Sequence, residues 1–348
     1  MILLPFIRRS GLTLLVTGLV TGLCGVGVAD AQSVEDFYRS RNITIVVSSD
    51  AGGTTALYGR TIGEFIGRHI PGQPNIVMQF MSGGGGIRGA NYCYNIAPKN
   101  GSVLCHIQAG LPQVQLLDSR GVRFDVTKFS YLGRTSSTNS GIYVWHTVPA
   151  LTLLDVRDHE VIIGASGRGS ETYTDPTIIN SVLGTKFNVI LGYPGGGDID
   201  LALERGEITG DAGQILSVFV RKQYWLEDGL IRFLVQSGAR RHPRLPDVPL
   251  LQEFARNDEE RAIFEFLSSR AEIGMTLLVP PGVPADRVAA LRQAMADTLA
   301  DPEFLAAAEQ RNLDVIPASA EEVEAAVRNV LNTPTPVVTR IKEALGLE

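Results

Sequence analysis

The sequence predicts an α/β fold of two lobes, each a mainly parallel β-sheet flanked by helices. Short β-branched runs alternate with segments of helical periodicity along the chain, and this alternation is typical of parallel sheets covered by helices on both faces. Loops rich in glycine, serine and threonine follow the strands in two stretches, one before residue 100 and one after residue 160. Two lobes that face each other across a cleft account for both clusters.

The first stretch begins with Ile43 to Val47, a continuous β-branched run that predicts a strand buried on both faces. Apolar residues then recur at helical spacing until Pro71 and Gly72 end the helix. Further strands are predicted at 76–80 and 102–107, with a glycine-opened helix between them that extends to about residue 96.

The same alternation resumes after residue 140. Strands are predicted at 142–145, 161–163, 187–191, 231–235 and 273–279, and helices at 172–183, from about 198, and at 285–299, 302–310 and 321–331. We expect residues 32–139 and 238–348 to form lobe 1 and residues 140–237 to form lobe 2. The place of the second crossing between the lobes stays open.

The amino-terminal residues are typical of an export signal. Arg8 and Arg9 precede an uncharged run, residues 11–28, and Ala29 to Ala31 has the A-x-A pattern of a cleavage site. We therefore assign residues 1–31 as a signal peptide that is cleaved near Ala31. The alternative is a membrane anchor, but the run has only the minimal length for spanning a bilayer.

Composition limits the kinds of partner. The net charge is −6 and no basic run occurs, which argues against a nucleic-acid partner. Two cysteines follow the predicted cleavage site, Cys93 on a predicted helix and Cys105 on the next strand. An oxidising compartment permits a disulfide between them, and two buried thiols are the alternative. Scattered histidines and the lack of a second cysteine pair give no metal site.

Four loops are rich in small residues: 51–55, 83–86, 164–170 and 195–197. Each should end at a helix N-terminus, where the first amide hydrogens have no intrahelical partner and the dipole is positive. Glycine lets a ligand approach the backbone closely. Such loops hold a carboxylate or a phosphate without a charged side chain.

Two enzyme readings fit these loops poorly. Gly84, Gly86 and Gly89 match G-x-G-x-x-G, but no acidic residue follows at the end of the next strand, so a dinucleotide fold is not expected. The segment around Ser166 lacks the closing glycine of a nucleophile elbow. Arg88 and Arg168 are the cations nearest the loops and either clamp an anion or brace their own loops.

Several segments resemble one family of exported receptors. They are ITIVVSSDAGGTTALYGR (43–60), MSGGGGIRGAN (81–91), IGASGRGSET (163–172), GYPGGGDIDLALERGEI (192–208) and DGLIRFLVQSGARRHPRLPDVPLLQEF (228–254). In the same order they are similar to the solute receptors of tripartite tricarboxylate transporters, also called the Bug or TctC family. The resemblance covers nearly the whole mature chain.

The resemblance implies a periplasmic, two-lobed binding protein of the type II-like class, without cofactor, metal or enzymatic activity. We expect a monomer that captures a di-, tri- or aromatic carboxylate and delivers it to a membrane permease with one large and one small subunit. A receptor that reports to a signalling partner is one alternative, and an exported serine hydrolase using Ser166 is another. Ala56 stands where many relatives carry an aspartate, which makes an amino-acid ligand less expected.

By matching position, the resemblance implies a ligand site on the loops of both lobes. Its residues are Ser48, Asp50, Ala51, Gly52, Gly53, Thr54, Thr55, Gly84, Gly85 and Gly86 in lobe 1, and Ser166, Gly167, Arg168, Gly169, Ser170, Thr172, Tyr193, Gly195 and Gly196 in lobe 2.

Overall fold

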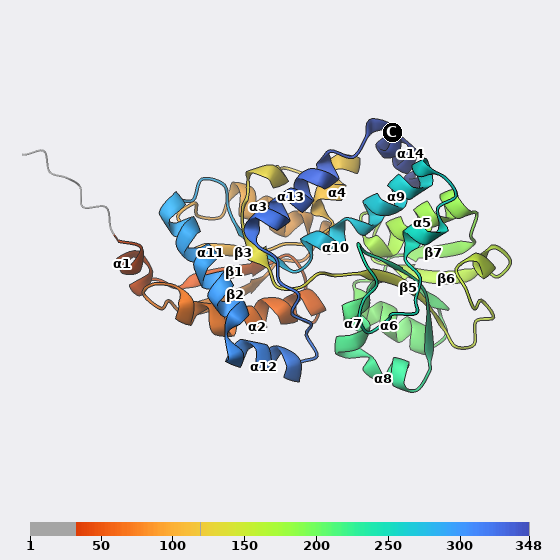
Figure 1. The fold of residues 1–348 in the computed structure, drawn as a ribbon, viewed down its shortest axis with the longest axis horizontal. Helices are drawn as coiled ribbons and strands as arrows, with labels where there is room; N and C mark the ends of the chain where they lie inside the picture. Colours follow the sequence, from red (N-terminus) through yellow and green to blue (C-terminus); the bar gives the residue numbers. More distant parts are fainter. Residues whose placement is uncertain (1–32, 119, 348) are drawn as a thin grey trace, which may run out of the picture. The chain divides into compact units, whose positions relative to one another are not determined.

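Two five-stranded sheets organise the chain in the computed structural model, which describes residues 33–118 and 120–347 (Figure 1). The predicted signal peptide and its cleavage site near Ala31 lie outside the described residues. Both sheets are mixed and carry helices on each face, which confirms the predicted α/β class.

Sheet A has the strand order β2-β1-β3-β10-β4. Its strands are β1 (Ile43–Val47), β2 (Ile76–Phe80), β3 (Val103–His106), β4 (Ser130–Arg134) and β10 (Thr276–Val279). β1 pairs in parallel with β2 and β3, whereas β10 runs antiparallel to both of its neighbours. Val47 is in register with Phe80 and with His106, so the carboxyl ends of β1, β2 and β3 meet at one edge.

Sheet B has the order β7-β6-β8-β5-β9. Its strands are β5 (Ser140–Trp145), β6 (Val161–Ala165), β7 (Phe187–Leu191), β8 (Gly210–Gln214) and β9 (Ile231–Ser237). β6 pairs in parallel with β7 and β8, and β5 is antiparallel to β8 and β9. Each sheet therefore has one reversed strand among four that share a direction.

Helices cover both faces of sheet A because the interior strand β1 presents apolar side chains to both. Ile45 and Val47 pack with α2 (Thr54–His69), α11 (Ala285–Ala300) and α12 (Pro302–Gln310), while Val46 points to the opposite core. That core holds α3 (Ile87–Asn95), α4 (Leu111–Leu117) and α13 (Ala320–Leu331). The short helix α1 (Val34–Arg39) joins the first face through Phe37 and Tyr38.

Sheet B is covered in the same way. α6 (Gly196–Glu204), α7 (Ile215–Arg221) and α8 (Gln223–Glu227) pack on one face, around Tyr143 and Trp225. α5 (Glu171–Leu183), α9 (Asp258–Ser268) and α14 (Thr335–Leu345) pack with Ile142 and Val144 on the other. This second core is continuous with the α3–α4–α13 core of sheet A, and α14 contacts α4 as well as α5 and α9.

The chain passes from sheet A to sheet B between β4 and β5 and returns between β9 and β10. The two connecting segments are hydrogen-bonded to each other. Thr135 N donates to Met275 O at 2.8 Å, and Met275 N donates to Ser136 O at 2.9 Å. Asn139 Nδ2 also donates to Gln236 Oε1 at 3.0 Å. These strand positions are compatible with the predicted lobes, whose residue boundaries stay a prediction.

Some elements differ from the sequence prediction. β4, β8, α1, α4, α7, α8, α9 and α14 were not anticipated. β10 begins at Thr276 instead of residue 273, because Arg270–Ile273 forms the one-turn helix α10, which Gly274 ends at a φ of 53°. Four short 3-10 turns complete the described chain: Gly84–Gly86, Val126–Lys128, Leu154–Arg157 and Leu251–Phe254.

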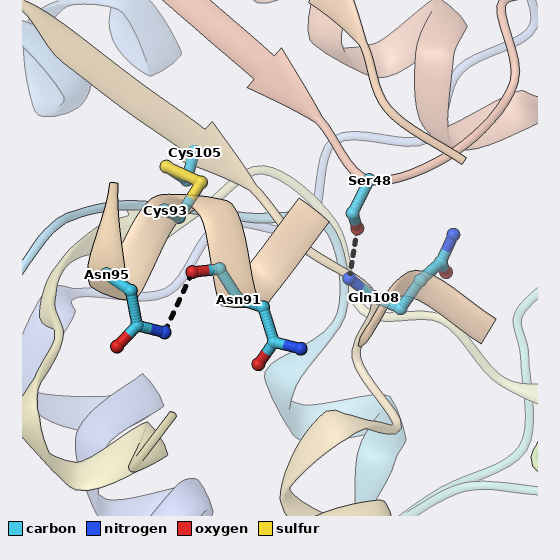
Figure 2. The surroundings of a disulfide bond; sticks show 6 residues. All are labelled: Ser48, Asn91, Cys93, Asn95, Cys105 and Gln108. Atoms are coloured by element: carbon cyan, nitrogen blue, oxygen red, sulfur yellow. Dashed lines mark hydrogen bonds between the residues drawn. A yellow bond between two sulfur atoms is a disulfide. The ribbon is translucent and has the colours of Figure 1, made fainter. Parts of the chain in front are cut away.

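The two cysteines form the disulfide that the sequence left open. Cys93 on α3 and Cys105 on β3 are joined by an S–S bond of 2.10 Å, with their Cα atoms 6.5 Å apart (Figure 2). The bridge fastens α3, the helix that follows the glycine run, to the strand beneath it. In Figure 2 the Ser48–Gln108 hydrogen bond lies in the same neighbourhood, where the loops after β1 and β3 meet.

Candidate functional site

The loop after β1 leads directly into the start of α2. Gly53 is the N-cap of α2 and no side chain caps this helix end. Asp50 folds back on its own loop, where its Oδ1 accepts a hydrogen bond from Gly52 N at 2.8 Å. The amide hydrogens of Thr54 and Thr55, at the positive end of a 16-residue helix, therefore have no side-chain acceptor.

The glycine run uses a backbone that only glycine adopts readily. Gly83, Gly84, Gly85 and Gly86 all have positive φ, from 59° to 129°. At Gly86 a Cβ would also lie 2.7 Å from Gln108 Cγ. The start of α3 therefore packs closely against the segment that contains Gln108.

The four glycines do not all face one way. A Cβ on Gly85 would lie 3.6 Å from Gly169 O, in the loop of sheet B. Gly83 and Gly84 instead border a groove of about 650 Å³ along α3, together with Met81, Ile87, Arg88, Asn91, Tyr92, Ile96, Arg120 and Gly121. Gly85 is therefore the member of the run that the structure places against the other sheet.

Ser48, the residue that follows β1, packs against α3 and the loop after β3. It is 2% exposed, and its Oγ accepts a hydrogen bond from Gln108 N at 3.1 Å. A Cβ on Gly89 would lie 2.7 Å from Ser48 Cβ, so α3 rests directly on this serine. The position of Ser48 suits bracing of the site more than direct contact with a ligand.

The loop after β6 is held by its own polar groups. Ser170 Oγ donates to Gly167 O at 2.6 Å, and it also shares a hydrogen bond of 2.8 Å with Thr172 Oγ1. Ser170 does not cap α5, so the first amides of that helix lack a side-chain acceptor. Arg168 Nη1 donates to the hydroxyl of Tyr173, whose ring it also covers at 5.5 Å. Arg168 thus braces α5, the second of the two roles considered for it.

The loop after β7 opens α6 at Gly195, again without a side-chain cap. The ring of Tyr193 packs on the strand below, because a Cβ on Gly164 would lie 3.1 Å from Tyr193 Cε2. Of the other helices, α9, α12 and α13 begin at Asn257, Asp301 and Ser319, whose side chains accept from helix amides, whereas no side chain caps the starts of α4, α7, α8, α10, α11 and α14. The loops singled out by their small residues lead into helix ends that no side chain caps.

Loops of the two sheets approach each other closely. Thr54 Oγ1 on α2 donates to Ser217 Oγ on α7 at 3.3 Å. A Cβ on Gly195 would lie 3.9 Å from Asp50 Oδ2. Together with the Gly85–Gly169 approach, these contacts bring Asp50, Thr54 and Gly85 of the sheet A loops to the sheet B loops. Ser217 was not predicted, since nothing in its local sequence marks it.

Charged groups lie close to the start of α6. Arg221 Nη1 on α7 contacts Asp200 Oδ2 on α6 at 3.0 Å, and a Cβ on Gly196 would lie 3.3 Å from Arg221 Nη2. Burial raises the pKa of the Asp200 carboxyl, and the Arg221 guanidinium opposes that rise. Burial also raises the pKa of Asp211 to about 7, although the Tyr143 hydroxyl donates to its carboxylate at 2.8 Å.

A second buried network lies at the start of α5. Glu171 Oε2 accepts from Ser140 Oγ at 2.8 Å and lies 3.6 Å from Arg270 Nε. Arg270 also forms an ion pair with Asp175 on α5. Burial raises the pKa of Glu171, against the effect of Arg270. This network links α5 to the segment that returns the chain to sheet A.

Two kinds of feature are absent from the described residues. Across 33–118 and 120–347, no group of three or more histidine, cysteine, aspartate or glutamate side chains is arranged to hold a metal ion. Within the same ranges no helix has both the length and the apolar character needed to cross a bilayer. His106 is fully buried, and neither of its ring nitrogens has a hydrogen-bond partner among these residues.

Proteins of known structure share the fold of this chain. No family model matches the chain. A Cupriavidus necator relative, named UPF0065 protein in gbd 5'region, is 25% identical over 261 residues, which span 71% of this chain and 73% of that protein. The solved structure of the periplasmic binding protein BugD is similar with a TM-score of 0.69 at 20% identity, over 89% of this chain and 99% of its own.

Two further solved structures of similar fold contain a small dicarboxylate. A Rhodopseudomonas palustris protein with adipate has a TM-score of 0.68 at 19% identity, over 87% of this chain and 97% of its own. MatC from the same organism, with bound malate, has a TM-score of 0.66 at 18% identity, over 88% of this chain and 99% of its own. The chain has the fold of the Bug and TctC periplasmic binding proteins, as the resemblance implied.

Proposed function

We propose that this chain, with the fold of those receptors, is a periplasmic solute-binding protein that encloses a small carboxylate and delivers it to a membrane permease. The observation that carries the proposal is the opposition of the two loop clusters. Thr54 at the start of α2 contacts Ser217 across the sheets, and Gly195 at the start of α6 faces Asp50. A ligand held there meets helix ends from both halves of the molecule.

The chemistry of these loops favours an anion. The first amides of α2, α5 and α6 have no side-chain acceptor, and the helix dipole adds partial positive charge at each. Hydroxyls of Ser217 and Thr172 are further donors, whereas the hydroxyl of Thr54 already donates to Ser217 Oγ. Malate and adipate, the ligands of two proteins with this fold, are small carboxylates.

We assign the ligand site to the predicted loop residues of both halves, with Ser217 added. The lining is proposed to be Asp50, Ala51, Gly52, Gly53, Thr54, Thr55, Gly85, Gly86, Ser166, Gly167, Gly169, Ser170, Thr172, Tyr193, Gly195, Gly196 and Ser217. Ser48 and Arg168 support it through their own loops, and Gly84 lies on the groove along α3.

The arrangement argues against a hydrolase. Ser166 is exposed, and its hydroxyl makes no hydrogen bond with any group in the part of the chain that the structure describes. A serine nucleophile needs a base within hydrogen-bond reach. We therefore propose binding without catalysis, in a monomer located in the periplasm.

Ligand-induced stabilisation tests the proposal. The mature protein is titrated with malate, adipate, citrate and benzoate while thermal unfolding is followed, and neutral diols of the same length serve as controls. A ligand present at a hundred times its Kd should stabilise the protein by about 2.7 kcal/mol. If none of these acids shifts the unfolding temperature while calorimetry also detects no heat of binding, the receptor proposal is wrong.

Closure is a separate expectation. A Cβ added to Gly85 would lie 3.6 Å from Gly169 O, and one added to Gly195 would lie 3.9 Å from Asp50 Oδ2, so the opposed loops leave little room between them. We therefore expect a ligand to enter only when the two halves separate. We expect the free protein to have a larger radius of gyration by solution scattering than the liganded protein. Equal radii with bound ligand would contradict closure and leave binding intact. Loss of carboxylate uptake in a deletion strain, restored by the wild-type gene, tests the permease partner.

A further inference from the structure

Two opposite charges flank the same short stretch of backbone in the proposed site. The guanidinium of Arg221 lies beside Gly196, and the carboxylate of Asp50 approaches Gly195 from the other sheet. Consecutive Cα atoms are only about 3.8 Å apart. A ligand that sits on the loop before α6 therefore meets a cation on one side and an anion on the other.

Arg221 is oriented toward this loop by its neighbours. Its Nη1 contacts Asp200 Oδ2 at 3.0 Å, and the Asp200 side chain is only 5% exposed. Its Nη2 lies 3.3 Å from where a Cβ of Gly196 would be, and its Nε is buried without a hydrogen-bond partner among the described residues. Ser217, one helical turn earlier on α7, makes the contact with Thr54. The guanidinium thus belongs to the surface of α7 that faces the loops.

Asp50 is exposed, and only one of its two carboxylate oxygens accepts a hydrogen bond. Its Oδ1 accepts from Gly52 N, which leaves Oδ2 free. A Cβ on Gly53 would lie 3.6 Å from that Oδ2, and one on Gly195 would lie 3.9 Å from it. In the described part of the chain no lysine, arginine or histidine forms an ion pair with Asp50. Its negative charge is therefore available to whatever occupies the loops.

We propose that the ligand is a carboxylate that also carries a hydrogen-bond donor, either a hydroxyl or an ammonium group. Its carboxylate binds Arg221 and the start of α6, and its donor binds Asp50 Oδ2. This inference rests on the proposed receptor function and narrows the class of ligand. It also revises the expectation drawn from Ala56, because Asp50 supplies an acidic group from a position six residues earlier.

The physical reason is the cost of confining like charges. When the loops enclose a ligand, water leaves and electrostatic terms grow. A carboxylate placed against Asp50 is repelled, whereas a hydroxyl or ammonium donates to it, and a charge-assisted hydrogen bond is stronger than a neutral one. A site that is built to accept a donor rejects the analogue that lacks it.

A matched ligand series tests the proposal directly. Succinate, malate and aspartate share a four-carbon diacid skeleton and differ at one carbon, which bears hydrogen, hydroxyl or ammonium. Adipate, 2-hydroxyadipate and 2-aminoadipate repeat the series with six carbons. We expect the tightest hydroxyl or ammonium member to bind at least about tenfold more tightly than its parent diacid by calorimetry.

Two variants assign the groups. Asp50→Asn keeps an oxygen for Gly52 N but removes the charge, so the preference for the donor-bearing acid should fall at least about tenfold, while the parent diacid binds as before or more tightly. Arg221→Gln should weaken every member of the series. Because Arg221→Gln leaves Asp200 buried and unpaired, the double variant Asp200→Asn/Arg221→Gln checks the same loss without that cost.

Exposed residues of the same half supply the controls. Arg205→Gln removes a cation at the other end of α6, and Asp228→Asn removes an anion after α8. Both should bind all ligands as the wild type does. If the parent diacids bind as tightly as the donor-bearing acids, or Asp50→Asn leaves the preference unchanged, the inference fails and the receptor proposal stands. If no carboxylate of any kind binds, both fail.

Discussion

Asp175 on α5 and Arg270 on α10 form a buried ion pair across 95 residues of sequence. The two residues are 4% and 5% exposed. The pair ties the helix that follows the ligand loop of sheet B to the segment that leads back into sheet A. Replacing one member of a buried ion pair by a neutral residue is destabilising, because the other charge stays buried and loses its partner.

We expect Asp175→Asn to lower the free energy of unfolding by about 3 kcal/mol. Arg270→Met added to it should recover part of the loss, since it removes the buried cation that has lost Asp175 and retains only Glu171 at 3.6 Å. Urea denaturation of both single variants and the double variant measures the coupling. Arg340→Met, which removes an exposed pair with Glu343, should change stability by no more than about 0.5 kcal/mol. Additive losses at 175 and 270 would contradict the pairing.

The disulfide should stabilise the fold appreciably. Cys93 and Cys105 close a short loop with a sequence separation of 12, for which the loss of unfolded-state entropy corresponds to about 3 kcal/mol. A reductant should therefore lower the midpoint of chemical unfolding. In the Cys93→Ser/Cys105→Ser double variant the midpoint should start low and not respond to reductant. A wild-type midpoint that is insensitive to full reduction would be evidence against the bridge.

The contribution of His106 to the free energy of unfolding should decrease in mild acid. Burial lowers its pKa from 6.5 to about 4, so between these pH values the unfolded chain binds a proton that the folded chain does not. Stability from this group is complete above pH 6.5 and falls as the pH drops toward 4, by about 3 kcal/mol in total. Replacing His106 with leucine removes this contribution, so the difference in stability between the wild type and the variant should shrink as the pH falls from 7 to 4.

Asp211 should act in the opposite direction over nearly the same range. Burial raises its pKa from 3.8 to about 7, so the folded chain holds a proton that the unfolded chain releases. Asp211 contributes about 4 kcal/mol to the free energy of unfolding below pH 3.8, and this contribution is lost as the pH rises toward 7.

The two groups nearly cancel in the wild type, and single variants separate them. The free energy of unfolding of Asp211→Asn should increase as the pH rises from 4 to 6.5, because only the His106 contribution remains. The free energy of unfolding of His106→Leu should decrease over the same pH range, because only the Asp211 contribution remains. Matching profiles for the two variants would refute the assignment of either group. The pH dependence of ligand binding, followed in parallel, shows how far the loops respond to the same protonations.

Gly167 offers a clean test of the loop after β6. A Cβ there meets nothing within 4 Å, and its φ is not positive. Gly167→Val should therefore fold with near wild-type stability but lower carboxylate affinity at least about tenfold, because the new side chain occupies ligand space. Gly85→Val, at a φ of 63°, should lose stability as well as affinity. If Gly167→Val binds carboxylates with wild-type affinity, the loop after β6 does not line the ligand site.

Much of the fold was predictable where a strand carries its own signal. The runs at β1, β2 and β7 are rich in Val, Ile and Phe, and the structure has the predicted bounds. β8 reads Gly-Asp-Ala-Gly-Gln and has no such signal. It exists because β5 and β6 pair with it, and Gly210 is needed there because a Cβ would lie 2.8 Å from Tyr143 O.

The same division applies to the candidate site. Small residues before a helix marked the four loops, since uncapped amides and close backbone approach require them. Ser217 and Arg221 lie on α7, whose own sequence is an ordinary apolar helix. They reach the loops only because sheet B and α2 are folded against each other, so their role was visible in the structure alone.

The position of β10 has a consequence for how the protein acquires its structure. Sheet B is assembled from strands within residues 140–237, whereas the strand between β3 and β4 in sheet A arrives from residues 276–279. Until that late segment emerges from the ribosome or finds its place, β3 and β4 are open edges that invite association with other chains. We expect sheet B to fold before sheet A. The rate-limiting step should be the insertion of β10 between β3 and β4, because this pairing joins segments that are far apart in the sequence.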